Sequence, residues 1–511
     1  MKSTTKLLAY FFGGLSLVAL STSCNKLEDF GNTNVDPNIS TYAETGTLIS
    51  SAQGRLITRG TVLASPAGAD EKAMELTGGI FCQYFAEPTY PGTSRYTDPQ
   101  FNGSQFYSGV LYDIEQVILR NTNPADMPAA AVSGSNVNQK SIARIMKAYV
   151  LWVITDKWGN VPYSEALKGS ANLTPAYDPQ ELIYKDLLKE LTEAVAEFDP
   201  NGVAVKGDLM YSGNIAKWKK LANSLRMLIS LRTSKVYPNP GEYAAQEFSA
   251  AVNDAGDYIK TNADNWVINY PGNALYYNNP WYATANSADN AVAQTFTDAL
   301  TGFGDTRINA FVSGSTTGVP FGLATAASTS VTYARILATP WKTTSGPVVV
   351  INASSVLLAL SEAIERGWVA GDSKTAYDDG VKASFDQWNV SIPGNYLTSG
   401  PANFLSGAGV ASIGGPSVAG SNAHTDTKLE RINVQQWFSF YPMGQQGWAN
   451  WRRTGMPDIK PTIYPATGHT QIPRRYTYGT TDYSLEPNEV AEASAAMGGD
   501  DQDTRMWWDK P

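Results

Sequence analysis

The sequence predicts a mainly α-helical protein with long irregular loops. Apolar residues recur at helical spacing in several segments between residues 139 and 440, and neighbouring segments are joined by short turns. Long stretches rich in Gly, Ser, Thr, Asn, Pro and Tyr separate the helical segments. Paired helices of this length indicate stacked helix–turn–helix units. No fixed-period repeat is visible in the sequence, so a solenoid would have to be a degenerate one.

Three segments carry the strongest helical pattern. Apolar side chains recur three or four positions apart through Gln139–Gly159, and the terminal glycine can close that helix. The second helix is expected to begin with Asp178 as its N-cap, Pro179 in the first helical position and Glu181 completing a capping box. In Asn214–Val236, one face is apolar and basic residues gather toward the C-terminal end.

The remaining helices and the loops follow from the same patterns. Further helices are predicted at Met74–Glu87, Ala244–Ile259, Ala291–Leu300, Ser354–Arg366, Ala376–Trp388 and Leu429–Phe440. The loop-rich parts are expected around residues 89–108, 262–350 and 392–427. Loops this long are uncommon in a folded domain and are often functional, so they are the first place to look for a ligand site.

The N-terminus has the layout of a bacterial export signal. Lys2 and Lys6 precede an uncharged stretch from Leu7 to Leu20, and the small residues Ser21–Ser23 follow it. A short membrane-anchor helix is the alternative interpretation. The apolar stretch is shorter than the ~20 residues that a transmembrane helix needs, which favours a signal peptide.

A cysteine directly after this signal resembles the acylation site of a bacterial lipoprotein. Cys24 would take a diacylglyceryl group and become the first mature residue, although Ser21 stands where a lipobox usually has a large aliphatic residue. Glu28 and Asp29 resemble the surface-display signal of Bacteroidetes lipoproteins. Each buried CH₂ of an acyl chain contributes about 0.8 kcal/mol to membrane binding. The expected division is a signal peptide at 1–23, a lipidated tether at 24–44 and a helical domain at 45–511.

Charge and cysteine content exclude two classes of protein. Removing the signal takes away two lysines and no acids, which moves the net charge from −9 to −11. We therefore expect no nucleic-acid partner, because phosphate contacts need clustered Lys and Arg. Lipidation of Cys24 would leave Cys82 without an intrachain partner, so the fold cannot rest on a disulfide framework.

The sequence offers little evidence for catalysis. It contains no HExxH, no cysteine pair with metal-ligand spacing, no P-loop and no nucleophile elbow. His424 and His469 both lie in loops, and the acidic stretch Gly498–Asp503 lacks the spacing of an EF-hand. We therefore predict no catalytic residue, no cofactor and no metal site. A surface glycoside hydrolase remains a rival hypothesis, because that chemistry needs only two carboxylates.

The segment Trp448–Pro457, "WANWRRTGMP", places two arginines next to two tryptophans. One interpretation is that Arg452 or Arg453 stacks on an aromatic ring and grips an anionic or sugar ligand. The other is a structural ion pair that fixes the end of a helix. We favour the structural interpretation, because the segment joins a helix to a turn.

The loops contain aromatic residues mixed with asparagines. Rings can stack on sugar faces while side-chain amides pair with hydroxyl groups, although the same rings could instead pack down within the loop. From composition alone, one wall of a ligand site is expected around residues 276–282 and a second in the loop at 89–108. The expected ligand-binding residues are Tyr276, Tyr277, Asn279, Trp281 and Tyr282, with Tyr90, Tyr96 and Phe101.

Several motifs in order along the chain resemble the SusD/RagB family of outer-membrane nutrient-binding lipoproteins. They are "YVLWVITDKWGNVPYSEAL" (149–167), "YDPQELIYKDLLKELTEAV" (177–195), "GNIAKWKKLANSLRMLISLR" (213–232), "YDDGVKASFDQW" (377–388), "WANWRRTGMP" (448–457), "IPRRYTYGTTDYSLEPNEV" (472–490) and "GGDDQDTRMWWD" (498–509). The opening "NVDPN" at 34–38 is similar to one subgroup of that family. The likeness covers essentially the whole chain.

This resemblance implies a tetratricopeptide-like scaffold of helix pairs with a ligand-bearing region built from the long loops. It also implies a nutrient-binding protein, not an enzyme, that is lipid-anchored at the outer membrane and exposed at the cell surface. Such proteins capture oligosaccharides, or sometimes peptides, and deliver them to a SusC-like TonB-dependent transporter. The matching motifs belong to the scaffold. They therefore identify no ligand residue, because the binding loops vary most.

The leading hypothesis is a cell-surface glycan-binding lipoprotein that works with such a transporter. A protein of the same architecture that binds peptides or another nutrient is the first rival, and a charged pocket would favour it. A surface glycoside hydrolase would need two carboxylates that face each other across a cleft, ~5–10 Å apart. A purely structural surface lipoprotein would have its loops packed shut.

Overall fold

The computed structural model describes residues 43–56, 75–99, 101, 103–273, 278–405, 427–466 and 468–511. The expected signal peptide, Cys24 and nearly all of the tether lie outside the described residues. Tyr276, Tyr277 and His424 lie outside them as well. Residues from Glu44 to Pro511 form one compact unit by their contacts.

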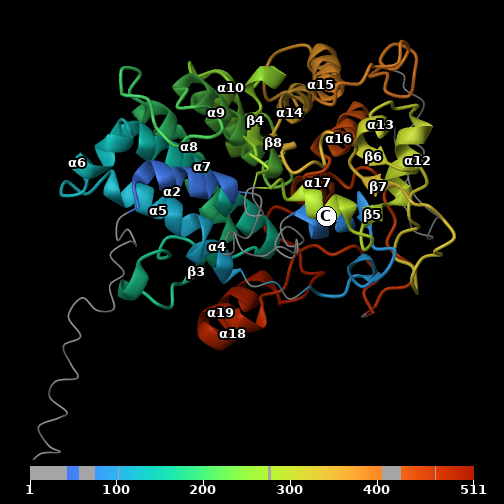
Figure 1. Cartoon of the computed structure of the whole chain (residues 1–511), viewed down its shortest axis with the longest axis horizontal. Helices are drawn as coiled ribbons and strands as arrows, with labels where there is room; N and C mark the ends of the chain where they lie inside the picture. Colours follow the sequence, from blue (N-terminus) through green and yellow to red (C-terminus); the bar gives the residue numbers. More distant parts are fainter. Residues whose placement is uncertain are drawn as a thin grey trace, which may run out of the picture. The chain divides into compact units, whose positions relative to one another are not determined.

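The described chain is mainly helical, which confirms the fold class (Figure 1). The α-helices are α2 (Thr45–Gly54), α3 (Thr77–Phe81), α4 (Ser104–Ser108), α5 (Val110–Arg120), α6 (Met127–Ala130), α7 (Asn136–Trp158), α8 (Gln180–Glu197), α9 (Ile215–Arg232), α10 (Tyr243–Val252), α11 (Trp281–Asn286), α12 (Gln294–Gly302), α13 (Ile308–Phe311), α14 (Ala353–Glu365), α15 (Ser373–Gln387), α16 (Lys428–Phe440), α17 (Gly444–Thr454), α18 (Thr480–Leu485) and α19 (Pro487–Met497). The 3₁₀ turns are η4 (Thr93–Arg95), η5 (Ala131–Ser133), η6 (Gly169–Ala171) and η7 (Asn262–Asp264). Among the described helices, none is long and apolar enough to span a bilayer.

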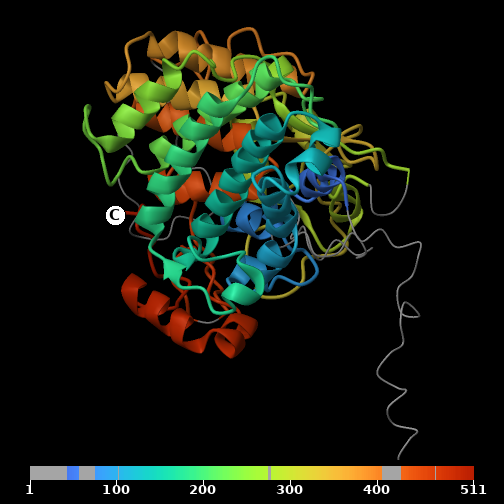
Figure 2. The same cartoon turned by 90° about the vertical axis from the view of Figure 1, so that its left-hand side faces the viewer.

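The long helices pack as neighbours in the order in which they follow along the chain. Helix α7 packs against α8, α8 against α9, and α9 against α10. A second group consists of α14, which packs against α15 and α16, and of α17, which packs against α16. The contact between α9 and α14 joins the two groups (Figure 2). This arrangement is the scaffold of tetratricopeptide-like helix pairs that the sequence predicts.

Helix α7 lies at the centre of the scaffold. Its side chains are buried on nearly every face, polar ones such as Gln139 and Asp156 included. The hydroxyl of Ser135 caps its first turn by accepting the backbone N–H of Asn138. Gly159 ends it with a φ of 87°, a conformation that favours glycine. The predicted helix at 139–159 is therefore confirmed.

The start of α8 differs from the sequence prediction. The helix begins at Gln180 with Pro179 as its N-cap, and no side chain caps it. Asp178 instead belongs to a short strand, and its carboxylate accepts the backbone N–H of Ser164 at 2.7 Å. The predicted capping box is therefore wrong. Asp178 pairs in a strand, although the local sequence alone predicts it as the N-cap of α8.

Three other predicted helices are shorter than expected, two of them because the chain forms a strand pair where the sequence predicts a helix. The expected helix at Met74–Glu87 contains only the short α3, because the chain then turns and pairs Phe85 with Val292 in a strand. For the same reason the helix expected from Ala291 begins only at Gln294. The expected helix Ala244–Ile259 ends at Val252. The helices predicted in 214–236, 354–366, 376–388 and 429–440 are present, and each end lies no more than four residues from the expected one.

Short antiparallel strand pairs tie the loop-rich parts together. The strands are β1 (Phe85–Ala86), β2 (Val161–Pro162), β3 (Tyr177–Asp178), β4 (Trp266–Asn269), β5 (Ala291–Val292), β6 (Val312–Ser313), β7 (Arg335–Ile336) and β8 (Pro347–Ile351). They pair as β1–β5, β2–β3, β4–β8 and β6–β7. The pair β1–β5 joins segments that lie far apart in sequence. Strands β5, β6 and β7 lie next to α12 and α13, whereas β4 and β8 lie beside α9 and α14 (Figure 1).

Candidate functional site

A groove of about 200 Å³ lies where three loop segments meet. The segments are the turn after α3, the loop after β6 and the stretch that follows α17. The residues that line the groove are Gln83, Gln294, Thr295, Pro320, Phe321, Leu323, Lys460, Pro461, Thr462, Ile463 and Tyr464. Ile463 is 60% exposed and Tyr464 is 47% exposed, so an apolar side chain and an aromatic ring stand open to solvent at its rim.

Buried polar side chains hold the inner end of the groove. The Gln83 amide donates a hydrogen bond to the backbone carbonyl of Lys460 at 2.6 Å and accepts one from the Thr295 hydroxyl at 2.6 Å. The backbone of Gln83 has a φ of 59°, in the left-handed region. These bonds join the turn after α3 to α12 and to the segment after α17, so three separate parts of the chain fix the position of one amide.

The outer wall is fixed in a similar way. The Thr462 hydroxyl donates to the carbonyl of Gly322 at 2.8 Å, and the Thr462 backbone N–H donates to the Tyr96 hydroxyl at 2.9 Å. A Cβ atom on Gly322 would lie 2.2 Å from the Thr462 hydroxyl, and its φ is 62°, so this close approach requires glycine. Arg95 donates to the carbonyl of Tyr464 at 2.8 Å. The exposed ring of Tyr464 therefore stands on a backbone that is held in place.

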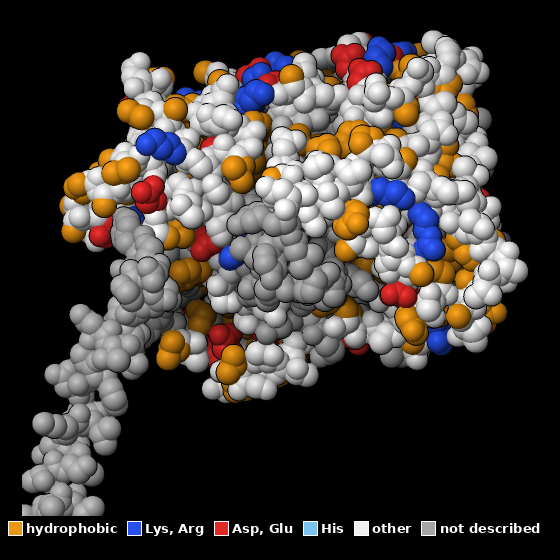
Figure 3. Space-filling model, viewed as in Figure 1, with side chains coloured by type: hydrophobic (Ala, Val, Ile, Leu, Met, Phe, Trp, Pro, Cys, Tyr) orange, Lys and Arg blue, Asp and Glu red, His pale blue; other side chains and the backbone are white. Residues whose placement is uncertain are grey.

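The groove carries almost no net charge. Among the described residues that line it, Lys460 is the one that carries a charge, and its ammonium group is paired with Asp458. Figure 3 shows the face that carries α12, α13 and β5 to β7. Uncharged side chains prevail there, with a few Lys and Arg side chains and scattered acids among them. An uncharged groove with exposed apolar and aromatic side chains suits a neutral polar ligand better than an ionic one.

The first predicted wall is only partly at the surface. Trp281 is buried at the start of α11 and its ring lies 5.6 Å from that of Phe85. The Asn279 side chain is also buried, where it accepts the backbone N–H of Trp281 at 2.9 Å and donates to the carbonyl of Trp341 at 2.8 Å. Tyr282 is 43% exposed. Asn279 and Trp281 therefore support the loop, whereas Tyr282 is open to solvent.

The second predicted wall also contains both exposed and buried residues. Tyr90 is 71% exposed. Tyr96 is fully buried, and its pKa is raised above its usual value by that burial. Its ring lies 6.3 Å from Phe321, directly behind the groove. Phe101 is half-buried against Tyr476, with ring centroids 5.4 Å apart.

The two predicted loops are neighbours, because the Thr89 hydroxyl donates to the carbonyl of Ala288 at 3.3 Å. Among the described rings, however, no contact joins Tyr90 to Tyr282. The sequence reasoning did not include Phe321, Ile463 and Tyr464. The signal that could have found them is the stretch Lys460–Gly468, "KPTIYPATG", in which apolar residues stand between prolines without helical or strand spacing.

Comparisons with known proteins now bear on this geometry. A family profile described as starch-binding and associating with the outer membrane matches residues 37–479. The chain belongs to this SusD-like family. No curated protein matches the sequence.

Solved structures of other SusD-like proteins share the fold. A SusD homologue from Bacteroides uniformis is 26% identical, with a TM-score of 0.73, and the match covers 91% of this chain and 99% of that one. A structure described as a chitin-binding protein is 26% identical, with a TM-score of 0.70, over 90% of this chain and 100% of that one. A chitin-binding SusD homologue from Flavobacterium johnsoniae is 23% identical, with a TM-score of 0.72, and the match covers 91% of this chain and 98% of that one. At this identity the likeness supports the fold alone.

The arginine motif of this SusD-like protein lies in the scaffold. Arg453 of α17 forms a two-bond ion pair with Glu362 of α14, at 2.6 and 2.8 Å, and both side chains are buried. The Arg452 guanidinium stacks 3.6 Å above the ring of Trp448 and donates to the carbonyl of Asp156 at 2.7 Å. Its burial lowers the pKa of Arg452 to about 10. The structural interpretation of this motif is the one that the contacts support.

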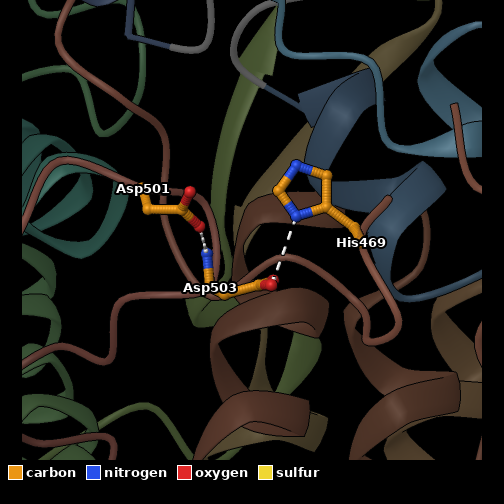
Figure 4. Close-up of side chains that lie close together, drawn as sticks. All are labelled: His469, Asp501 and Asp503. Atoms are coloured by element: carbon orange, nitrogen blue, oxygen red, sulfur yellow. Dashed lines mark hydrogen bonds and ion pairs between the residues drawn. The ribbon is translucent and has the colours of Figure 1, made fainter. Parts of the chain in front are cut away.

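One group of side chains in the described residues has the composition of a metal site. His469, Asp501 and Asp503 bring ligand atoms within 4.8 Å of one another (Figure 4). The Nδ1 atom of His469 lies 3.2 Å from a carboxylate oxygen of Asp503, and the Asp503 backbone N–H donates to Asp501 at 2.8 Å. The hydrogen bond and the tight turn account for the proximity without an ion. An imidazole with two carboxylates could hold Zn²⁺ more readily than Ca²⁺, which prefers an all-oxygen set.

Proposed function

We propose that this SusD-like protein binds a neutral oligosaccharide in the groove and delivers it to a SusC-like transporter. The observation that carries the proposal is the uncharged groove with Tyr464 and Ile463 exposed at its rim. The family description as starch-binding and the chitin-binding neighbour support a glycan as the ligand.

The side chains of the groove divide the work of holding a sugar. The ring of Tyr464 offers an apolar face against which a pyranose can stack, and Phe321 extends that surface into the groove. The Gln294 side chain is exposed at the lining and leaves its amide available to sugar hydroxyls. Gln83 and Thr295 are hydrogen-bonded to each other and act as support. The ring face of Tyr464 provides contact area for the sugar, and the amide of Gln294 can fix its orientation.

The proposal assigns binding and no catalysis. No carboxylate is among the described residues that line the groove, and glycoside hydrolysis needs a pair of them on either side of the scissile bond. A peptide ligand is the alternative within the same architecture. The neutral lining favours a sugar over the charged side chains and termini of short peptides.

The lipid anchor and the transporter partnership belong to the same proposal. An acylated Cys24 would hold the protein at the outer membrane, consistent with the family description. From there the expected tether at 24–44 would keep the groove close to a membrane-embedded transporter. In cells, Cys24→Ala should move the protein out of the membrane fraction, and a SusC-like protein should co-purify with the wild-type chain.

A glycan screen tests the ligand. The chain from Asn25 onward is incubated with an array of neutral, acidic and amino-sugar oligosaccharides and, in parallel, with a library of short peptides. We expect saturable binding of neutral oligosaccharides, confirmed by calorimetry. Binding of peptides without any glycan would overturn the proposed ligand, and failure of a SusC-like protein to co-purify under gentle extraction would overturn the proposed partnership.

A further inference from the structure

A second cavity shares no lining residue with the groove. It has a volume of about 130 Å³ and lies between α4, α7, the β2–β3 pair and α18. Both views place α18 next to this part of the scaffold (Figure 1 and Figure 2). Among the described lining residues, the side chains are aromatic, aliphatic or glycine apart from Ser104 and two acids. The lining includes the rings of Tyr107, Trp158, Tyr177 and Tyr478, the aliphatic side chains of Ile154, Val161 and Leu167, and the carboxylates of Asp482 and Glu486.

Hydrogen bonds fix the two carboxylates at one wall. The backbone N–H of Gly479 donates to Asp482 at 2.9 Å, and the Tyr177 hydroxyl donates to Glu486 at 2.7 Å. The backbone N–H of Glu486 donates to the carbonyl of Asp482, so the two residues are one helical turn apart and project from the same side. They therefore do not face each other across a bond, as the two acids of a glycosidase would.

Neither acid has a cationic partner among the described residues. Burial is the main influence on Asp482 and raises its pKa, and the nearby carboxylate of Asp500 raises it further. Burial and the charges of Asp482 and Glu489 raise the pKa of Glu486. Arg475, whose guanidinium lies 4.8 Å from the centre of the Tyr478 ring, is ion-paired with Asp500 at 2.6 Å. Asp482 is buried and Glu486 is half-buried. Buried carboxylates are normally paired, so this wall of the cavity carries negative charge that no described ion pair balances.

The aromatic rings in the wall of the cavity favour a cation, as the two carboxylates do. The rings of Tyr177 and Tyr478 meet edge to face, with centroids 5.5 Å apart and planes at 73°, and form a corner of the cavity. The electron-rich faces of such rings attract cations, most strongly where water is excluded. The Arg475 guanidinium already lies over the ring of Tyr478, so Tyr177 is the ring of this corner that is offered to a ligand. A metal ion would require several oxygen ligands, whereas most of this lining is carbon.

We propose that this cavity binds a protonated primary amine, with its ammonium group at Asp482 and Glu486 and its carbon chain along the aliphatic wall. An ammonium group has three donors for the two carboxylates, and its methylene stem suits Ile154, Val161 and Leu167. The amine could come from a lysine side chain or from an amino sugar. This site is separate from the glycan groove and does not depend on it.

The test uses n-butylammonium chloride as the probe and n-butanol, its neutral analogue, as the control ligand. Binding to the chain from Asn25 onward is followed through tryptophan fluorescence and ligand-observed NMR. We expect saturable binding of n-butylammonium with a Kd on the order of 1–10 mM, and at least ten-fold weaker binding of n-butanol. Equal binding of the two probes, or no saturable binding of either, would overturn the proposal.

Variants locate the site. Glu486→Gln keeps the shape of the side chain and should weaken n-butylammonium binding at least ten-fold, whereas Glu492→Gln, an exposed acid on α19 outside the cavity, should leave it unchanged. If Glu486→Gln does not fold, Ala166→Leu fills the cavity and should remove binding. Retained binding in a folded Glu486→Gln or Ala166→Leu chain contradicts the proposal. Comparison of Nα-acetyl-lysine methylamide with glucosamine then identifies the source of the amine.

Discussion

In the scaffold, Arg453 and Glu362 are buried together, each within 3% of complete burial, and they join α17 to α14. At the groove, the ring of Tyr464 is nearly half exposed and touches no described ring. The first pair has its partners already, so a ligand could add nothing to it. The second side chain has an open face, and its backbone is held in place by Arg95. The difference indicates that the helix pairs provide the stability of the molecule, while the loops present side chains for a ligand.

The largest expected effect comes from breaking the buried ion pair. Arg453→Met should lower the free energy of unfolding by about 3–5 kcal/mol, because the carboxylate of Glu362 stays buried with less compensation. Urea unfolding measures it. Lys189→Ala is the control, because Lys189 makes only long, exposed ion pairs, and it should change stability by less than about 0.5 kcal/mol. A small loss in Arg453→Met would show that the scaffold does not depend on this pair.

The second effect is a difference in stability between two variants of adjacent residues in α11, the buried Trp281 and the exposed Tyr282. Trp281→Ala should destabilise the protein by about 3 kcal/mol, because it leaves a cavity against Phe85. Tyr282→Ala removes an exposed ring from the next position and should change stability by less than about 0.5 kcal/mol. Thermal unfolding of both variants checks this. Equal stability of the two variants would mean that Trp281 is not a packing residue.

The third effect is a loss of stability at low pH, caused by protonation of Glu362. Burial raises the pKa of Glu362, but the guanidinium groups of Arg453 and Arg366 outweigh it and hold the pKa at about 2 instead of 4.5. Because the folded pKa is the lower one, this carboxylate contributes stability above about pH 4.5 and loses it as the pH falls toward 2. The contribution is up to about 3 kcal/mol.

Unfolding free energies measured from pH 7 to pH 3 test this contribution. The decrease below pH 4.5 should be shallower in Glu362→Gln than in the wild type. Asp379→Asn changes a largely exposed acid and should keep the wild-type slope. An unchanged slope in Glu362→Gln would contradict the assigned pKa.

The same contrast explains what the sequence could and could not predict. Helices such as α7 and α9 show their apolar faces directly in the sequence, and their end signals at Gly159 and Asn214 are local. The start of α8 was misplaced, because Asp178 pairs in a strand with a residue that local pattern does not reveal. The family likeness identified the scaffold, and the matching motifs include the buried arginines.

The ligand side was harder to predict, because burial in loops depends on contacts distant in sequence. Composition alone treats Trp281 and Tyr282 as equal, yet one is buried and the other is exposed. Tyr96 is buried, and its hydroxyl accepts the backbone N–H of Thr462, more than 360 positions away in the sequence. The proline-flanked Tyr464 carried no periodic signal, so it entered only when the structure showed the groove.

The central claim is that the groove binds a glycan through the exposed ring of Tyr464. Its most direct test is the calorimetric Kd of the best array hit for Tyr464→Ala beside Tyr112→Ala, which removes an equally exposed tyrosine from α5 of the scaffold. We expect the Kd to rise on the order of ten-fold in Tyr464→Ala, about 1.4 kcal/mol, with unfolding unchanged, and to stay at the wild-type value in Tyr112→Ala. A wild-type Kd in a folded Tyr464→Ala chain would contradict the claim.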